Sequence, residues 1–468
     1  MRRKSKNILP GFFQNEQTDD KGLKNVRHYR DVYKTLDEYL VKYPEIEQLS
    51  HDALKSLCKP GSSREREPDF TTQNLFRAVL VARMENLPWR EATIAIAESV
   101  TLQKFCRLFK KESINHHLLC QAAGHCDPEM WANVNTFLAH RMVVEEKITP
   151  QTIRADCTVV ETNIHWPTDS SLCWDVYRTI DRITRKVREL GFGPYLPVFR
   201  LHPKKIKSLD FRINKFAKSK CPKRKKKVRK HYDTIIERTG EAIVKAKEIA
   251  KALASLANEL AMAFGVELDA YLPWMERIVS VARRRYNGEK VPNKEKVFSL
   301  FEPHTELIQK GKRSKPIEFG HLVLLSSTRE KFITDCLAFE ISPPESTLIP
   351  VTMDRHEELF GAKPKNAAMD KGFHPGKEEF EDLLDEYENE VEYLGVPAQI
   401  NDFGDEEMNR FQRFRAGIEG TISFLKRSFG LSRCVFKGFR GFCRFVGSGV
   451  FCHNLLTMIR ADLAAADT

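Results

Sequence analysis

The spacing of apolar and polar residues predicts a largely helical chain that is interrupted by two groups of strands. Residues 1–65 are expected to form a polar leader with one helix, from Val32 to Tyr43. A second helix is predicted after Thr71 and Thr72, either of which can cap its N-terminus. One face of this helix carries Leu75, Val79 and Ala82.

A break and a third helix follow. Residues 86–89, Asn-Leu-Pro-Trp, end the helical pattern, and Pro88 stands just before a helix predicted from Arg90 to Ser99. Two helices joined by a short turn are compatible with DNA recognition and equally with an ordinary helical hairpin. The pattern alone leaves both interpretations open.

The first predicted strand runs from Thr152 to Glu161 and alternates between two faces. One face carries Ile153, Ala155, Cys157 and Val159, and the other carries Arg154, Asp156 and Thr158. An ionised carboxylate in the middle of a strand is costly to bury without a partner. Asp156 is therefore expected at a wet edge of the sheet, in an ion pair or beside a metal ion.

From about Asp175 to Asn287 the chain is predicted to be helical and basic. Its densest run of positive charge, Lys218 to Lys230, is either a solvated loop between helices or a surface that contacts DNA phosphates, and we favour the contact with DNA. His231 to Phe264 is expected to form one long helix. Its apolar residues recur every seven positions, which suits an internal hairpin or a dimer contact.

Strands return after this segment. Glu318–Leu325 and Phe332–Glu340 are predicted to form a hairpin, and residues 367–369 form a short apolar strand that ends at Asp370. Ligands of open α/β sheets bind beyond the carboxyl ends of strands, so Asp370 is a candidate site residue, although an Asp near Gly372 also suits a turn. The remaining predicted elements are helices at Thr352–Phe360, Lys377–Tyr387 and Gly441–Leu463 and a strand at Glu392–Val396.

The stretch from Arg410 to Gly430 predicts a helix with an unusual polar stripe. At about 100° per residue, Gln412, Arg415, Glu419 and Lys426 share a face about 60° wide. The simple interpretation is a solvated face with an Arg–Glu pair four residues apart. Gly417 and Gly420 flank Glu419, and because glycine is unfavourable inside a helix, we expect a close approach to the backbone there. Gly430 is expected to end the helix.

Composition and charge narrow the class of protein. The 468 residues carry 76 Lys and Arg against 64 Asp and Glu, a net charge of +12, which favours a polyanionic partner. The 41% of hydrophobic residues predicts a globular protein. Eleven scattered cysteines suit a reducing cytosol, and neither a signal peptide nor a membrane span is expected.

A cluster of histidine and cysteine side chains is expected near residue 120, where His117 and Cys120 stand three residues apart. The cluster also includes His116, His125 and Cys126. Some zinc ligands share this spacing, but the whole pattern matches no standard zinc module. A packed helix is therefore the preferred interpretation over a metal site.

The stripe from Arg410 to Gly430 resembles the last signature of DDE insertion-sequence transposases, in which an Arg, three residues, a Glu, six residues and a Lys follow one another. The residues that follow, GLSRCVFKGFRGFCRFVGSGVFCHNLL, are most similar to the ISNCY-type family, which usually has Tyr where this chain has Gln412. The segment ADCTVVETNIHWPTDSSLCWD resembles the first catalytic block, and PDFTTQNLFRAVLVARMENLPWREATIAIAESVTLQKF resembles the N-terminal helical domain of these proteins.

The resemblance implies that Asp156, Asp370 and Glu419 form a catalytic triad that binds Mg²⁺ or Mn²⁺, with two ions expected. Asn163, His165, Trp166 and Asp169 belong to the same catalytic block as secondary candidates, and the preferred interpretation is that they shape the crossing from strand to helix. Glu318 and His321 are expected near the site but not as ligands. Asp335 and Asp354 are rivals of Asp370 that lack its apolar strand and its glycine. The candidate DNA-binding residues are Gln412, Arg415, Lys426, Lys223, Arg224, Lys225, Lys226, Lys227, Arg229, Lys230 and Arg90.

The expected fold class is α/β, with a ribonuclease H-like catalytic domain that carries a large, mostly helical insertion and follows an all-helical N-terminal DNA-binding region. The expected divisions are a leader (1–65), a helix-turn-helix-like domain (66–145), the first part of the catalytic domain (146–174), the basic insertion (175–290), the rest of the catalytic domain (291–440) and a C-terminal helix and tail (441–468).

The resemblance implies a cytoplasmic, nucleoid-associated bacterial enzyme. It is expected to cleave and join DNA at the ends of its element and at a target, as a homodimer in the DNA complex. No membrane and no small-molecule substrate is expected. Two alternatives are a nuclease of the same fold that does not join DNA, and a DNA-binding derivative that has lost catalysis.

Overall fold

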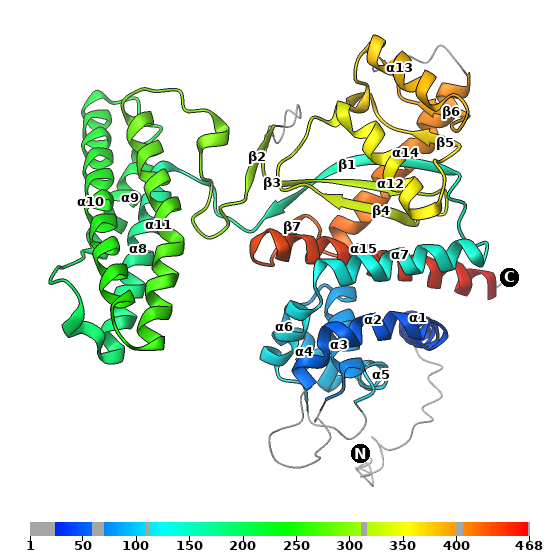
Figure 1. Ribbon diagram of the computed structural model, residues 1–468, viewed down its shortest axis with the longest axis horizontal. Helices are drawn as coiled ribbons and strands as arrows, with labels where there is room; N and C mark the ends of the chain where they lie inside the picture. The colour runs from blue at the N-terminus through cyan, green and yellow to red at the C-terminus, as the bar shows by residue number, and fades with distance from the viewer. Residues whose placement is uncertain (1–23, 59–69, 109–112, 310–315, 399–405, 467–468) are drawn as a thin grey trace, which may run out of the picture.

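The computed structural model describes residues 24–58, 70–108, 113–309, 316–398 and 406–466. These residues form an α/β protein with one mixed sheet and many helices. Figure 1 shows a group of N-terminal helices below the sheet and a separate bundle of long helices to one side. Three clusters of buried apolar side chains correspond to the N-terminal helices with one face of the sheet, the bundle, and the other face of the sheet.

The N-terminal helices pack into one core with the last helix of the chain. They are α1 (Lys24–Lys42), α2 (Pro44–Leu54), α3 (Thr72–Met84), α4 (Trp89–Glu98), α5 (Val100–Phe105), α6 (His116–His125) and α7 (Pro128–Val144). The helix predicted at Val32–Tyr43 corresponds to the C-terminal half of α1, which begins earlier and ends at Lys42, whereas α2 was not predicted. Thr71 caps α3 as expected, because its hydroxyl oxygen accepts the N–H of Asn74 and the Asn74 side chain accepts the N–H of Thr71.

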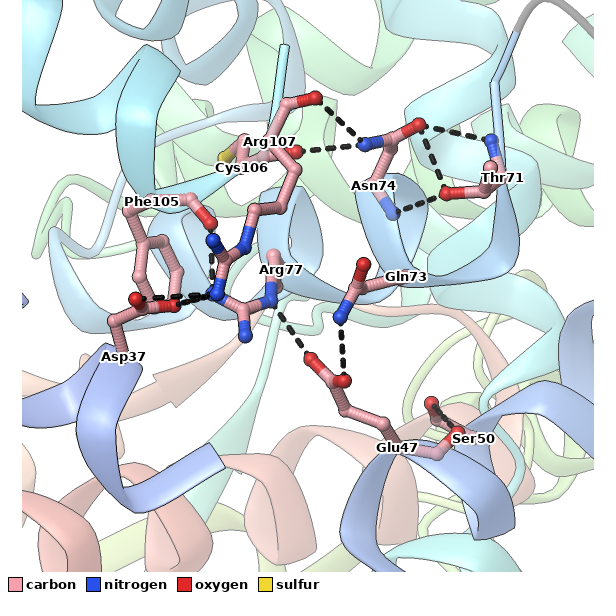
Figure 2. A network of polar contacts seen from close by, with 10 residues as sticks. All are labelled: Asp37, Glu47, Ser50, Thr71, Gln73, Asn74, Arg77, Phe105, Cys106 and Arg107. Atoms are coloured by element: carbon pink, nitrogen blue, oxygen red, sulfur yellow. Dashed lines mark hydrogen bonds and ion pairs between the residues drawn. The ribbon is translucent and has the colours of Figure 1, made fainter. Parts of the chain in front are cut away.

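A buried arginine connects these helices (Figure 2). The Arg77 side chain on α3 is fully buried, pairs with Asp37 on α1 and donates to Glu47 on α2 at 2.7 Å. It also donates to the carbonyl oxygen of Phe105 at 2.9 Å, at the end of α5. Because an isolated buried charge is strongly unfavourable, this network fixes how the four helices meet. Residues 24–58 therefore belong to the helical core and are not a separate leader.

The sheet is built around β1 (Thr152–Thr162). Its other strands are β2 (Glu306–Gln309), β3 (Ile317–Ser327), β4 (Ile333–Ala338), β5 (Asn366–Ala368), β6 (Tyr393–Gly395) and β7 (Arg433–Cys434). On one side β1 pairs antiparallel with β3, which pairs antiparallel with β4 and β2. On the other side β1 pairs parallel with β5, and β5 with β6. The predicted β3–β4 hairpin is confirmed. The short strand predicted at residues 367–369 is also confirmed, as β5.

The helical bundle is inserted between β1 and β2 and has a core of its own. It consists of α8 (Asp169–Val187), α9 (Pro203–Phe216), α10 (Pro222–Ala254) and α11 (Glu259–Tyr286). The prediction of one helix from His231 to Phe264 is wrong, because α10 ends at Ala254 and the Asn258 side chain caps α11. The apolar residues of α10 are buried against α11, so an internal hairpin takes up the seven-residue spacing.

Helices cover both faces of the sheet. The alternation predicted for β1 is confirmed, since Ile153, Ala155 and Val159 pack on the face that is covered by α12 (Leu348–Phe360) and α13 (Lys377–Tyr387). The opposite face meets α14 (Glu406–Ser428) and α15 (Gly438–Ala466). By length and composition α15 could cross a membrane, but 72% of its most apolar window is buried in the protein, which is consistent with the core helix of a soluble protein.

Candidate active site between β1, β5 and α14

The register of two parallel strands brings Asp156 and Asp370 together. Arg154 on β1 aligns with Ala368 on β5, so two further residues along each strand lead to Asp156 and Asp370. The Asp370 carboxylate accepts the N–H of Gly372 at 2.8 Å and caps the short 3-10 helix η6 (Lys371–Phe373). Two acids that stand more than 200 positions apart in sequence are therefore neighbours at the same edge.

Asp156 is held in an electrostatically unfavourable place. Its side chain is only 16% exposed. Burial, together with the negative charges of Asp370 and Glu345, raises the pKa of Asp156 to about 7, against the opposing effects of Arg415 and of the Cys157 N–H. Of the three environments expected for Asp156, a fully wet edge is excluded by this burial. Because negative charges surround the Asp156 carboxylate, a cation placed beside it would be stabilised.

Helix α14 is fixed across the sheet by side chains on both sides. The Gln412 Nε2 group donates to the carbonyl oxygens of Met369 and Gly395, each at 3.2 Å, which attaches the helix to the ends of β5 and β6. Arg154 of β1 donates to the Phe414 carbonyl oxygen at 3.0 Å. These bonds give Gln412 a structural role, and its predicted contact with DNA stays a prediction.

The two glycines of α14 differ. A Cβ atom on Gly417 would lie 1.9 Å from Arg154 Nη1, so the predicted close approach to the backbone is confirmed there. At Gly420 nothing lies within 4 Å, so the same prediction is wrong at that position. Gly430 adopts a φ of 71° just after α14, as expected of a residue that ends a helix. Arg154 therefore sets the distance between α14 and β1.

Arg415 lies between two of the three predicted catalytic acids. Its guanidinium is 3.2 Å from Glu419 Oε1 and 3.9 Å from Asp156 Oδ2, and its side chain is 17% exposed. Glu419 is 64% exposed. Lys426 follows Glu419 by seven residues, about 10 Å along the same helix. The simple interpretation of the stripe, an Arg–Glu pair, is thus present, and the pair is seated beside Asp156.

Among the described residues, no group of three or more His, Cys, Asp or Glu side chains is arranged to hold a metal ion as it stands. The residues of the His116–Cys126 cluster lie on α6 and at its C-terminal end, where His117, Cys120 and His125 are exposed and Cys126 is buried. The donor chemistry of the carboxylate site nevertheless fits Mg²⁺, because Asp156 and Asp370 present hard oxygen atoms and their mutual repulsion favours a cation. Glu419 can contribute only when its pair with Arg415 opens.

The other predicted DNA-binding cations, on α10 and α4, lie outside this site. The basic run Lys218–Lys230, for which a solvated loop was one of two interpretations, lies mostly in the N-terminal part of α10, and its seven candidate cations are exposed. Arg224 lies over the Phe216 ring and Arg229 over the Tyr286 ring, both at 5.4 Å from the ring centroid. Arg90 is exposed in the first turn of α4. These positions are accessible to a polyanion.

Other predicted residues have structural partners. His165 pairs with Asp175 at 2.7 Å, and Asp169 pairs with Arg285 of α11 at 2.6 Å, so both secure the crossing from β1 to the bundle. Asp335, a rival of Asp370, is bound by Arg355. His321 is fully buried and stacks on His304.

Sequence reasoning missed Arg154 and Glu345. Arg154 was assigned only to a face of a strand, and Glu345 was not singled out at all. A glycine two residues after Asp370 is the one local signal that bears on Glu345, because a Cβ atom on Gly372 would lie 2.6 Å from Glu345 Oε2.

Comparisons with known proteins add no relative. No protein-family model matches the chain, and no curated protein and no solved structure matches it.

Proposed function

We propose that the protein is a DDE transposase that carries out metal-dependent cleavage and strand transfer of DNA. The observation that carries this proposal is the convergence of Asp156 and Asp370 under the helix that presents Arg415 and Glu419. The resemblance described above named the three acids together, and the structure brings the regions that hold them together. Nothing in the packing of the sheet by itself requires acids from β1, β5 and α14 to lie at the same edge, so their proximity supports a shared role.

The topology supports a ribonuclease H-like catalytic domain. The strand order β4-β3-β1-β5-β6 places the strand of the first acid at the centre and a parallel neighbour that ends in the second acid beside it. The helix with the third acid crosses both strands. This is the arrangement that we expected of such a domain, with the helical insertion between the first two strands.

In this proposal Asp156 and Asp370 hold a divalent cation through their carboxylate oxygens, and Glu419 joins them when DNA binds. Bound Mg²⁺ or Mn²⁺ would supply Lewis-acid stabilisation to an in-line displacement at phosphorus. Arg415 is placed to grip a phosphate beside the two acids, since a guanidinium can make two parallel hydrogen bonds to it. When Arg415 turns to a phosphate, Glu419 is released from its pair.

The basic N-terminal part of α10 would hold DNA phosphates away from the acids, and Arg90 would contact DNA through the helical N-terminal domain. Because such contacts are to the backbone, they position DNA and carry no sequence information. We expect two copies of the chain to act on the two ends of an element.

The test supplies the purified chain with labelled DNA ends of the element that bear a free 3′-hydroxyl, a target plasmid, and Mg²⁺ or Mn²⁺. A transposase yields joined products. Cleavage without joining would identify a nuclease, and binding without either reaction would identify an inactive derivative. Either of these results contradicts the proposal.

A further inference from the structure

An open groove on the helical bundle combines aromatic rings with positive charge. It has a volume of about 610 Å³ and lies where the end of α9, the basic part of α10 and the end of α11 meet. The rings of Phe216, Tyr232 and Tyr286 line it, together with the cations of Lys225 and Arg229. All nine lining residues belong to the described part of the chain, and none of them is an acid. The other four are Ala217, Val228, Asn287 and Gly288.

Two of the rings are held in place by the bundle. Tyr232 and Tyr286 are partly buried and pack against the core that the four helices share. Phe216 is the last residue of α9 and is also partly buried. A ring that is fixed before a ligand arrives loses little conformational freedom on binding. The groove therefore presents flat apolar surfaces that are already in position.

Two of the rings also carry a guanidinium group. The guanidinium carbon of Arg229 lies 5.4 Å from the centroid of the Tyr286 ring, and that of Arg224 lies 5.4 Å from the centroid of the Phe216 ring. A nucleobase can stack on an aromatic ring or on the plane of a guanidinium, and the N–H groups of the guanidinium can bind a phosphate. Rings and cations that alternate over a short distance suit the bases and phosphates that alternate along a DNA strand.

The surroundings keep the groove positively charged. Asp233 and Glu289, the acids that directly follow lining residues in sequence, are both paired. Arg283 donates to Asp233 at 3.3 Å, and Arg284 donates to Glu289 at 2.9 Å. A polyanion is therefore attracted to the groove. Phosphate contacts alone do not require three aromatic rings, so the rings indicate that bases are bound as well.

The rings of the groove can reach only bases that lie outside a duplex, because bases inside it stack on one another. We propose that this groove binds unpaired nucleotides of a DNA strand, with a base stacked at Tyr286 and Arg229 and a neighbouring phosphate at Lys225. The inference rests on the proposed function for DNA as the ligand, and it adds base stacking to the phosphate contacts of α10. A cleaved strand supplies such nucleotides where its terminal bases separate from the duplex.

The test measures binding of a fluorescein-labelled strand of about 16 thymidines and of a duplex of the same length, by fluorescence anisotropy of the full chain without divalent cations. Tyr286→Leu should weaken binding of the strand about tenfold and change binding of the duplex by less than about twofold. Tyr286→Phe keeps the ring and should bind both as the wild type does. The matched control is Tyr271→Leu, because Tyr271 is on the same helix and packs against the same core but lies outside the groove.

Two results would overturn the inference. Equal losses for strand and duplex in Tyr286→Leu would show that the ring only supports the helix that carries it, and unchanged binding of the strand would show that no base stacks there. Both results leave DNA joining at Asp156 and Asp370 standing, since joining is measured separately. A chain that does not join DNA, but loses strand binding selectively in Tyr286→Leu, would fail only the proposed function.

A strand without bases separates stacking from charge. On an abasic strand of the same length, which keeps its phosphates, the wild type and Tyr286→Leu should bind equally, because the ring has no base to stack on. Lys225→Gln should weaken binding of the thymidine and abasic strands by the same factor, since it removes a phosphate contact. A loss of about tenfold for Tyr286→Leu on the abasic strand would contradict the stacking. Displacement of the thymidine strand by polyglutamate as readily as by unlabelled strand would identify a site for acidic protein segments instead, and would also overturn the inference.

Discussion

Asp156 on β1 is 16% exposed beside two other acids, whereas the seven candidate cations of α10 all lie exposed on the inserted bundle. Interactions between charged groups are stronger at the buried site than on the exposed bundle. Water and salt screen each exposed cation, so these cations can act only through many weak contacts. In the buried site one charge shifts the pKa of its neighbour, so replacing a single residue is enough to change the charge of the site. The comparison predicts large effects of single changes on the sheet and graded effects on the bundle.

The largest expected effect is on catalysis. Asp156→Asn, Asp370→Asn or Glu419→Gln should each reduce strand cleavage and joining by on the order of 10³-fold or more, because the acids act as one unit. DNA binding measured by fluorescence anisotropy should survive, since the exposed cations are unchanged. Asp354→Asn, an exposed acid of α12, is the control and should keep near wild-type activity. Near wild-type activity in any triad variant would remove that residue from the site.

The next effect concerns the bundle. Replacing Lys223, Lys225, Lys226, Lys227 and Lys230 by Gln should lower the slope of log affinity against log salt by up to about 4, because each lost phosphate contact releases about one counterion fewer. As the matched control, Lys245→Gln and Lys247→Gln on the same helix should leave the slope unchanged. Each of those lysines already has a carboxylate partner, Glu248 and Glu276 respectively. An unchanged slope in the fivefold variant would show that this run does not contact DNA.

The third effect is a pH dependence of stability. His453 of α15 is buried beside the carbonyl oxygen of Lys331, and burial lowers its pKa to about 4. The unfolded chain takes up this proton near pH 6.5 and the folded chain only near 4, so stability is complete above 6.5 and falls between those values. The loss is roughly 3 kcal/mol.

Urea unfolding at a series of pH values checks this. His453→Gln should flatten the loss of stability below pH 6.5. His231→Gln, at a partly exposed position of the basic helix α10, should change it far less, because solvent screens that site. The same acid loss in His453→Gln as in the wild type would contradict the assignment.

The smallest effect separates two glycines of one helix. Gly417→Ala should destabilise the protein by about 1–3 kcal/mol, because its methyl group overlaps Arg154, which is itself held by Ser327 and Phe414. Gly420→Ala meets open space and should be neutral or stabilising by up to about 1 kcal/mol. Thermal unfolding of both variants gives the comparison, and equal effects would show that Arg154 does not fix α14.

Local patterns predicted most elements because periodicity and capping depend on neighbours in sequence. The cap at Thr71, the alternation of β1 and the end of α14 near Gly430 are of this kind. The break between α10 and α11 was missed because apolar residues continue at helical spacing up to it. Only the packing of the two helices against each other requires the chain to reverse there.

The amino-acid sequence was sufficient to place Gln412, Arg415, Glu419 and Lys426 on one helical face, since a fixed rotation per residue decides that. It held no information on which oxygen atoms from other segments meet this face. The pairing of β1 with β5, the reach of Arg154 to Gly417 and the approach of Glu345 to Gly372 were decided by tertiary structure. These contacts join residues far apart in the chain, and only the packing of the sheet between its helices selects them.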